Sequence, residues 1–365
     1  MAFDESSFSS KRSKKNWRFP RYLLYGFLLI SLLVFFSNRV SPAFFWPAGF
    51  LAPLAPLFYL LNVLLLIALL FVRPLGAALV GVILVVGFSI VSKSYQLNNI
   101  SNRQASFSFR VLSYNVSFFF VPTVFSEQYR SPTHNMNVVN AINWIKQDNA
   151  DILCLQEFFD DQDSDIYNTV ENLTDTTGYT THFVYKDQVK NKTRRGLIIL
   201  SKFPIEDKGV IFTSQNHYNG AIYADVRTPQ GIVRVVNVHL ESMRLSSRKR
   251  NPFAALVAYK RGIVTHAKQT EDLISFLRQS PYQLVLCGDI NETPYSYVYH
   301  QLASVLHNAF EEAGQGFGVT YLGKNLSFLR IDQQFYSSDF DILRFVTHKD
   351  ITFSQHVPIE ASYSF

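Results

Sequence analysis

Residues 285–294, VLCGDINETP, organise the rest of this chain. The apolar start of the stretch predicts a buried strand, and Gly288 lets the backbone turn where that strand ends. Asp289 and Asn291 lie two residues apart, a spacing that puts both side chains on one face of an extended segment. The carboxylate could orient or deprotonate a water, and the amide could hydrogen-bond a phosphoryl oxygen without adding a second negative charge. This pair suits phosphate chemistry, although an Asx turn that caps a helix starting at Thr293-Pro294 explains the same residues.

Short apolar strands, separated by helices and loops, make up most of the second part of the chain. Strands are predicted at 109–116, 151–157, 196–201, 222–226, 232–240 and 283–287, and helices at 137–147 and 262–279. Polar residues recur where strands end and near the C-terminus: Asn115, Glu157, His239, Asp289, Asn291, Asp332 and His356. Taken singly, each has a structural explanation, such as a turn cap for Asn115 or a satisfied core histidine for His239. Because functional residues gather where the strands of a rigid sheet finish, their recurrence indicates one shared site.

Six short blocks carry a resemblance to a known family. In chain order they are SYNV with Asn115, LQE with Glu157, NVHL with His239, GDIN at 288–291, RID at 330–332 and the terminal QHVPI. On these blocks the chain resembles the endonuclease/exonuclease/phosphatase superfamily, the DNase I-like proteins that include abasic-site endonucleases, inositol-polyphosphate 5-phosphatases and neutral sphingomyelinases. The resemblance covers about 107–365. It is specific for the family and leaves the substrate open.

This resemblance implies a fold, a reaction and a role for each matched residue. The fold is a four-layer αββα sandwich, in which two mixed sheets lie face to face with helices outside and the site at one end. The reaction is the hydrolysis of a phosphate ester by a Mg²⁺-dependent nuclease, phosphatase or phosphodiesterase, with Mn²⁺ as an alternative. The implied roles are as follows: Glu157 binds Mg²⁺, Asn115 holds the metal site, Asp289 positions or activates the water, Asn291 contacts the phosphate, Asp332 holds His356, and His239 stabilises transition-state charge. Whether His356 or Asp289 takes the proton of the water stays open.

One position departs from the pattern of the family. Where the family usually has Ser-Asp-His, this chain has Ser354, Gln355 and His356. The amide of Gln355 can still reach a metal, directly or through a water, but it lacks the charge of a carboxylate and cannot act as a base. Two hypotheses follow: a working phosphoesterase, or a catalytically weak or inactive phosphate-binding scaffold domain.

The first hundred residues differ sharply in composition from the rest. Residues 1–21 carry six basic and two acidic side chains, and the runs 22–36, about 50–72 and 75–91 are nearly free of charge. These runs predict three transmembrane helices, because each is long and apolar. A cleaved secretory signal is the alternative, but no small-residue cleavage site follows the first run and two more apolar runs do. The predicted organisation is a basic cytoplasmic tail at 1–21, a transmembrane region at 22–95, a linker at 96–106 and the catalytic domain at 107–365.

The topology follows from the basic residues. The N-terminal tail and Arg73 would face the cytoplasm, which leaves Arg39 and Lys93 on the other side. With three spans, everything after about residue 95 lies outside the cytoplasm, so we expect an integral protein of the inner or plasma membrane with an extracytoplasmic catalytic domain. With two spans this orientation reverses.

Charge and cysteine content limit the partners. The formal net charge is +6, of which the tail contributes four and residues 22–100 three, so residues 101–365 are close to neutral. The basic balance therefore gives no argument for nucleic-acid binding, although 241–262 is locally basic. Nucleic acid, phospholipid and small phosphorylated molecules all stay open as substrates. Cys154 and Cys287 are expected as buried thiols without a disulfide partner.

Overall fold

The computed structural model of the chain describes residues 21–98, 105–120, 132–175, 177–185, 193–214, 218–242, 251–323 and 328–365. The predicted basic tail lies outside these residues except for Arg21. The same holds for 243–250, which lie within the locally basic segment 241–262.

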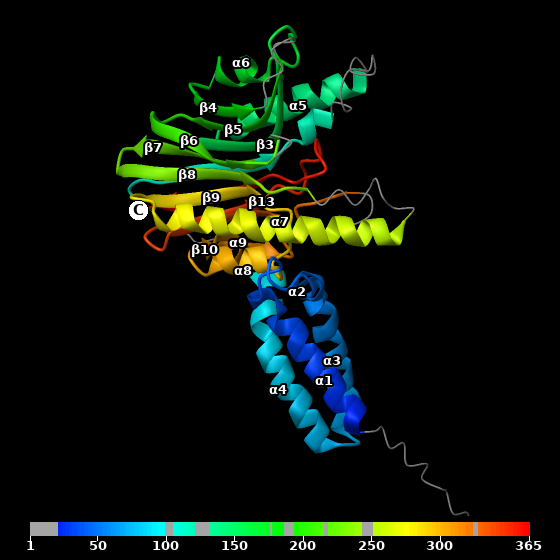
Figure 1. Cartoon of the computed structure of the whole chain (residues 1–365). Helices are drawn as coiled ribbons and strands as arrows, with labels where there is room; N and C mark the ends of the chain where they lie inside the picture. The colour runs from blue at the N-terminus through cyan, green and yellow to red at the C-terminus, as the bar shows by residue number, and fades with distance from the viewer. Residues whose placement is uncertain are drawn as a thin grey trace, which may run out of the picture.

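The N-terminal part is a bundle of apolar helices below the rest of the molecule (Figure 1). Its elements are α1 (Arg21–Phe36), η1 (Ser37–Arg39), α2 (Pro47–Leu51), η2 (Ala52–Leu54), α3 (Ala55–Leu70), α4 (Pro74–Val91) and η3 (Ser92–Ser94). Three continuous helical segments, Arg21–Arg39, Pro47–Leu70 and Pro74–Ser94, are long and apolar enough to cross a membrane. They coincide with the three predicted runs, and Pro74 begins the third helix because its fixed φ suits a first helical turn.

Two six-stranded sheets packed face to face form the second part. One sheet has the order β10-β12-β9-β8-β7-β6 and the other β13-β14-β2-β3-β5-β4, while β1 and β11 form a separate pair. The strands are β1 (Gln96–Leu97), β2 (Phe109–Asn115), β3 (Ile152–Asp161), β4 (Thr180–Tyr185), β5 (Thr193–Ser201), β6 (Ile205–Thr213), β7 (Gly220–Thr228), β8 (Gly231–His239), β9 (Gln283–Asp289), β10 (His307–Asn308), β11 (Gln315–Gly316), β12 (Asp332–Tyr336), β13 (Asp341–Thr347) and β14 (Ile359–Ser364).

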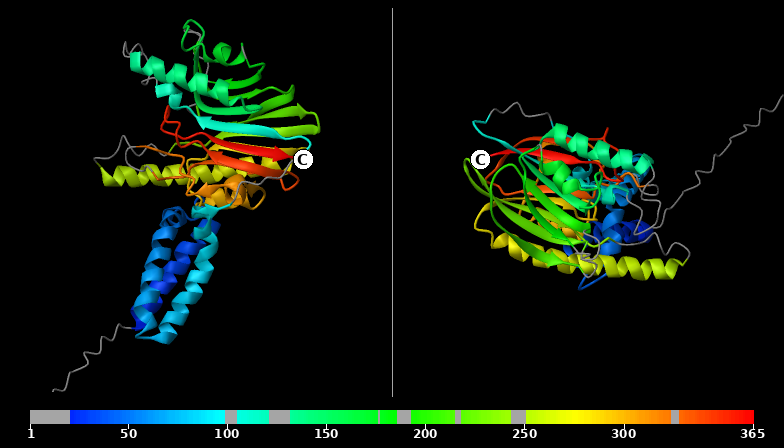
Figure 2. Two further views of the ribbon diagram at one scale, coloured as in Figure 1. Left: turned by 180° about the vertical axis from the view of Figure 1, so that it is seen from behind. Right: turned by 90° about the horizontal axis from the view of Figure 1, so that it is seen from above.

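Helices cover the outer faces of both sheets (Figures 1 and 2). α5 (Pro132–Asp148) and α6 (Thr169–Thr174) lie on the β2–β3–β5 side, and α7 (Pro252–Arg278) and α8 (Tyr297–Ala303) on the β7–β8–β9 side. The short η4 (Ser117–Phe120) and α9 (Ala309–Ala313) complete the elements. The predicted four-layer αββα sandwich is confirmed.

The space between the two sheets is filled by apolar side chains, which is why the central strands are apolar in sequence. Apolar side chains of both sheets meet there, among them Val111, Ile199, Val235 and Val285, all fully buried. Cys154 and Cys287 belong to this core and are free thiols. Burial raises the pKa of Cys154, so it stays protonated and packs as a small apolar residue.

Strand direction brings the predicted residues to one end of the sandwich. β2 runs parallel to β3 and β8 runs parallel to β9, and the hydrogen bond between Asn115 and Asp289 shows that both pairs end on the same side. His239 pairs with Asp289 across β8 and β9, and Asp332 at the start of antiparallel β12 pairs with Asp289 from the other side.

The segment that was predicted as a linker begins in contact with the sandwich. Gln96 and Leu97 form β1 and pair with β11, and the next residue, Asn98, donates a 2.9 Å hydrogen bond to the carbonyl of Glu311. The guanidinium of Arg330 also donates to the carbonyl of Lys93 at 2.8 Å. The bundle and the sandwich are therefore joined by contacts as well as by the chain.

Candidate active site

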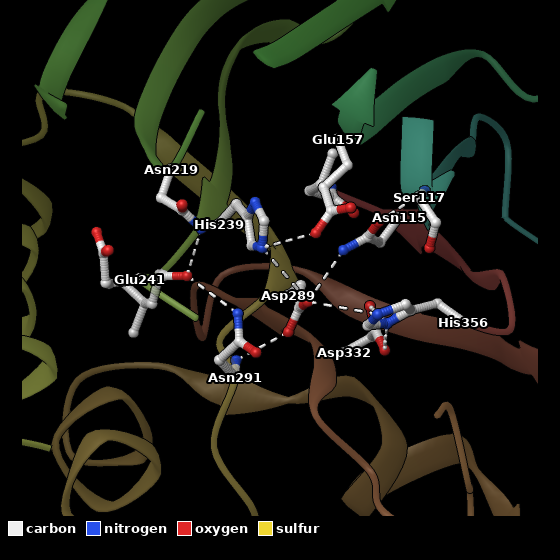
Figure 3. Close-up of polar contacts among 12 residues, drawn as sticks. Asn115, Ser117, Glu157, Asn219, His239, Glu241, Asp289, Asn291, Asp332 and His356 are labelled. Carbon is white, nitrogen blue, oxygen red and sulfur yellow. Dashed lines mark hydrogen bonds and ion pairs between the residues drawn. The ribbon is translucent and has the colours of Figure 1, made fainter. Parts of the chain in front are cut away.

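Asp289 lies at the centre of a polar network at the end of the sheets (Figure 3). Its Oδ1 accepts a 2.8 Å hydrogen bond from the backbone N–H of Asn291, and its Oδ2 accepts one of 3.0 Å from the Asn115 amide. The Nε2 atoms of His239 and His356 lie 3.6 and 3.7 Å from the same Oδ2. The carboxylate is thus fixed in orientation by two donors, with two imidazoles beside it.

His356 and Asp332 form a second pair in this network. The Nδ1–H of His356 donates to the Asp332 carboxylate, with the two oxygens at 2.9 and 3.1 Å. This bond fixes the tautomer and directs Nε2 toward Asp289. Burial alone would lower the pKa of His356, but the carboxylates of Asp332 and Asp289 raise it to about 9. The ring is therefore cationic at neutral pH.

His239 differs from His356 because no carboxylate is bonded to it. Its Nε2 has no hydrogen-bond partner among the described residues and lies 3.6 Å from both Glu157 and Asp289. Burial and the charge of His356 lower the pKa of His239 to about 3, so this ring is neutral at pH 7. A buried imidazole nitrogen without a partner is costly, and a ligand at this point would satisfy it.

Glu157 reaches the site through an irregularity in β3. The pairing of β3 with β5 shifts register between Leu155 and Phe158, and Glu157 has a φ of 47° in the left-handed region. A bulge of this kind redirects one side chain out of the strand alternation. Here the bulge turns the carboxylate of Glu157 toward His239. The Glu157 side chain is 24% exposed, whereas Asp289 is buried.

The side chain of Asn291 is fixed by a hydrogen bond within the protein. Its side-chain N–H donates a 3.0 Å bond to the carbonyl of Leu240, which also accepts from Asn219 at 2.8 Å. Asn291 has a φ of 52°, a conformation that asparagine tolerates better than most residues. One amide hydrogen is used in this way, and the amide group carries a second one.

Two hydroxyl residues that the strand-end pattern did not single out support the network. The hydroxyl of Ser354 donates to the carbonyl of Asn115 at 2.7 Å and accepts from the backbone N–H of His356 at 3.1 Å. Thr320 accepts from the backbone N–H groups of Ile331 and Asp332. The serine lies two residues before His356, a spacing typical of a local hydroxyl turn, so a local signal existed. The threonine lies in a distant loop and had none.

Gln355 lies apart from the other predicted residues. Its side chain is exposed, and its Oε1 accepts a 3.3 Å hydrogen bond from the hydroxyl of Tyr321. The remaining seven predicted residues are joined by the hydrogen bonds and ion pairs described above. The structure thus brings together Asn115, Glu157, His239, Asp289, Asn291, Asp332 and His356, and gives Gln355 a different neighbour.

The donor atoms of the site fit a hard divalent cation. Asp289, Asp332 and His356 place possible ligand atoms within 4.8 Å of one another. Because the His356 ring is protonated at neutral pH and bonded to Asp332, the carboxylates of this buried group are the atoms that could bind a metal. Glu157 adds a carboxylate whose pKa is raised by burial, and a cation would offset the desolvation that causes this shift. Carboxylate and amide oxygens are the ligands that Mg²⁺ and Mn²⁺ prefer.

The charges also fit acid–base chemistry. Burial and the nearby Asp332 raise the pKa of Asp289 to about 7, the range in which a carboxylate can accept a proton efficiently. The site therefore combines a carboxylate whose pKa lies near 7, a neutral imidazole and a cationic imidazole. Such a set can bind an anion and move a proton.

Comparisons with known proteins identify the family and the fold of the chain. A family model described as Endonuclease/Exonuclease/phosphatase family matches residues 112–356, whereas no curated protein matches the chain. Among solved structures, truncated Caenorhabditis elegans TDP2 matches at 18% identity and a TM-score of 0.50, over 72% of this chain and 100% of that chain. The human Nocturnin catalytic domain with bound sulfate anion matches at 18% and 0.50, over 74% and 97%. The mannosyl-6-phosphatase of Bacteroides thetaiotaomicron VPI-5482 matches at 17% and 0.50, over 70% and 100%.

The structural likenesses, at these identities, show the fold. The family model goes further, because it spans most of the chain and runs from the strand before Asn115 to His356 itself. Members of this family are generally hydrolases of phosphate esters and commonly use divalent metals. With its αββα sandwich and its polar network at the strand ends, the chain belongs to the endonuclease/exonuclease/phosphatase family.

Proposed function

We propose that the chain is a membrane-anchored, Mg²⁺-dependent phosphoesterase that hydrolyses its substrate by in-line attack of water. The observation that carries the proposal is the convergence of six polar side chains around Asp289, with the buried Nε2 of His239 unpartnered among the described residues. A structural network would satisfy such an atom. A phosphoryl oxygen would accept a hydrogen bond from it and complete the network.

The side chains divide the chemistry between them. Asp289, held by Asn115 and Asn291, orients the attacking water and takes its proton at Oδ2. His356, cationic and held by Asp332, stabilises the negative charge that develops on the phosphoryl group. His239 donates from Nε2 to a phosphoryl oxygen, and the second amide hydrogen of Asn291 does the same from the loop that follows β9.

Glu157 would hold the divalent cation, with Asn115 beside it. When bound, the cation would supply Lewis-acid polarisation of the phosphoryl group. Because Gln355 is exposed and bonded to Tyr321, this assignment does not depend on it. The chain then retains every side chain that the proposal requires despite its Ser-Gln-His sequence.

The anchor and its orientation belong to the same proposal. The three apolar helices support an integral membrane protein, and the distribution of basic residues supports an extracytoplasmic sandwich. The substrate is a phosphomonoester or phosphodiester of a nucleic acid, a phospholipid or a small phosphorylated molecule. A position beside a bilayer favours the lipid.

The test is hydrolysis of bis-p-nitrophenyl phosphate and p-nitrophenyl phosphate by the full chain in detergent, with Mg²⁺ and with EDTA. We expect turnover of at least one ester with Mg²⁺, its loss with EDTA, and its loss in Asp289→Ala. Absence of turnover with retained binding of inorganic phosphate would favour the scaffold alternative. Turnover that survives in both EDTA and Asp289→Ala would contradict the assigned site.

A further inference from the structure

The two halves of α7 have different surroundings. The C-terminal half packs on the sheet through residues such as Leu273 and Leu277, which are buried in the outer core. The N-terminal half carries three exposed apolar side chains, Phe253 at 72%, Leu256 at 42% and Val257 at 50%. Exposed apolar residues at this spacing form a continuous patch on one side of a helix.

The apolar patch continues into a contact with the membrane bundle. Phe253, Leu256, Lys260 and Ile263 follow one another at helical spacing along α7. A side chain at Gly49 of α2 would collide with Ile263, so the two helices touch there. Lys260 places its Nζ 4.9 Å from the ring centroid of Trp46, just before α2.

A second set of contacts fixes α7 on the same end of the bundle. The rings of Tyr259 and Phe50 lie 4.5 Å apart, and the hydroxyl of Tyr259 donates to the carbonyl of Gly49 at 3.3 Å. α2 is itself the first part of the candidate span Pro47–Leu70. α7 therefore crosses the bundle where a span would leave the bilayer.

The pictures agree with this placement. α7 runs across the junction between the sandwich and the bundle, and its N-terminal end projects beyond both (Figures 1 and 2). The α1–α2 connection also exposes Phe44 at 90% and Phe45 at 51%, beside Trp46. Aromatic residues at the ends of spans, together with a lysine, are typical of the membrane–water interface.

We propose that the N-terminal half of α7, Pro252–Ile263, lies in the surface of the bilayer that holds the bundle, with Phe253, Leu256 and Val257 among the acyl chains and Lys260 at the lipid phosphates. The occupant is the bilayer because the patch is continuous with the contact to a candidate span. The inference rests on the anchoring proposed above and not on turnover.

The middle of α7 connects the proposed bilayer contact to the loops of the active site. The buried His266 bonds Glu292 at 2.9 Å and the carbonyl of Glu241, while Gln269 accepts from the backbone N–H of Glu241 at 3.2 Å. Glu241 and Glu292 lie in the loops that follow His239 and Asn291. The position of α7 on the bilayer therefore sets the position of these loops above it.

The experiment reports lipid contact residue by residue. The full chain is reconstituted in vesicles of phosphatidylcholine and phosphatidylglycerol, with a nitrobenzoxadiazole dye on one introduced cysteine and a doxyl-labelled lipid as quencher. Cys154 and Cys287 are buried in the core, so the introduced thiol is the one that reacts. The test variants are Phe253→Cys and Leu256→Cys; Lys268→Cys, exposed further along α7, is the matched control, and Val85→Cys, 76% exposed on α4, reports the span.

We expect a blue-shifted emission and several-fold stronger quenching at 253, 256 and 85 than at 268. Quenching at 85 with solvent-like emission at 253 and 256 would overturn the inference and leave the anchor in place. Loss of quenching at 85 as well would overturn both. Shielding at 253 without lipid quenching, accompanied by a 253–253 disulfide in the unlabelled Phe253→Cys variant, would show that a second copy covers the patch and would also overturn it. None of these readouts depends on hydrolysis, so a failure of the proposed activity is seen separately.

Discussion

Two groups of side chains in this protein carry the same functional groups in different surroundings. Asp289, Asp332 and His356 form the site cluster at the strand ends, and Asp148, His348 and Glu360 form an outer cluster between α5 and the β13–β14 sheet edge. Each contains two carboxylates and an imidazole whose ligand atoms lie within 4.8 Å. Residue types and spacing alone would not separate them.

The two clusters differ in the source of their positive charge, and in the outer cluster an arginine supplies it. Arg110 places its guanidinium 3.0 Å from Glu360 and 3.6 Å from Asp148, and it also donates to the carbonyls of Asp148 and Asn149. In the site cluster the positive charge comes from His356 itself, and the neighbouring amides hold Asp289 open toward His239 and Glu157. The outer cluster is thus neutralised within the fold, whereas the site cluster is arranged to receive a ligand.

The largest effect is expected from replacing Asp289 with asparagine, and the same replacement of Asp148 in the outer cluster is its matched control. Asp289→Asn should reduce kcat for bis-p-nitrophenyl phosphate by about 10³-fold, because it removes the proton acceptor and its charge. Asp148→Asn should leave kcat within about two-fold, since it lies outside the site. Equal losses in the two variants would show that the activity follows overall stability and not the site cluster.

Asp332→Asn should reduce activity less and move its pH range. The carboxylates facing His356 raise its pKa to about 9, so the imidazolium is present below that pH and is lost above it. Removing Asp332 lowers this pKa, and the alkaline limb of kcat/KM should move to lower pH, with a loss of about 10²-fold at the optimum. The acid limb should follow Asp289, whose pKa is about 7. An unchanged alkaline limb would remove His356 from the mechanism.

Arg110→Ala tests the outer cluster through stability. Without the guanidinium, Asp148 and Glu360 face each other unpaired, and we expect a loss of about 1–3 kcal/mol in the free energy of unfolding. This appears as a lower Tm for the full chain in detergent. Turnover per folded molecule at 25 °C should stay within about two-fold. A loss of turnover at unchanged Tm would mean that the outer cluster takes part in function.

Glu360→Gln should change how stability depends on pH. Burial and the neighbouring Asp148 raise the pKa of Glu360 from 4.5 to about 7. The folded state therefore binds this proton more tightly than the unfolded chain, and stability falls as pH rises from about 4.5 through about 7. The glutamine variant should lack this fall, which is on the order of 1–2 kcal/mol in the free energy of unfolding between low and high pH and is measured as a shift in Tm. Parallel curves for variant and wild type would contradict it.

The smallest effect is expected from Gln355→Asp. Because the side chain is exposed and bonded to Tyr321, restoring the residue that the family usually has should change kcat by less than about three-fold. A gain of an order of magnitude would show that Gln355 limits the site, as the scaffold hypothesis supposes.

The fold was largely predictable because its central strands are apolar runs. Strands such as β2, β3, β8 and β9 bury both faces, so their sequences stand out from the loops. The strands that were not predicted include β4, β6, β10 and β13 at sheet edges, β12 and β14 inside the sheets, and the separate pair β1 and β11. β6 and β13 have mixed composition, with few fully buried residues, so periodicity gives a weak signal.

The start of α7 was also misplaced by the sequence. The helix begins at Pro252, ten residues before the predicted start, because Asn251 caps it by accepting from the backbone N–H groups of Phe253 and Ala254. The apolar residues at the start of α7 are exposed, so this part of the chain did not show the pattern expected of a helix that packs on the sheet, and no helix was predicted there. The pattern of these residues makes sense only beside the bundle, a long-range contact that the local sequence does not contain.

For the site, strand ends predicted which residues converge but not how they are oriented. The direction of Glu157 depends on a bulge, and that of Gln355 on Tyr321, which approaches from a loop more than thirty residues earlier in the chain. Both depend on tertiary contacts. The identity of the seven converging residues could be read from the chain, whereas their hydrogen-bond partners required the structure.

The central claim is that Glu157, beside the site cluster, holds the divalent cation that supports hydrolysis, and that the outer cluster does not. The most direct measurement is kcat/KM for the phosphate ester across a Mg²⁺ titration, in wild type, Glu157→Gln and His348→Ala. The account predicts that Glu157→Gln raises the half-activating Mg²⁺ concentration by about 10–100-fold, whereas His348→Ala leaves it unchanged. Identical titrations for wild type and Glu157→Gln, or a shift in His348→Ala alone, would contradict it.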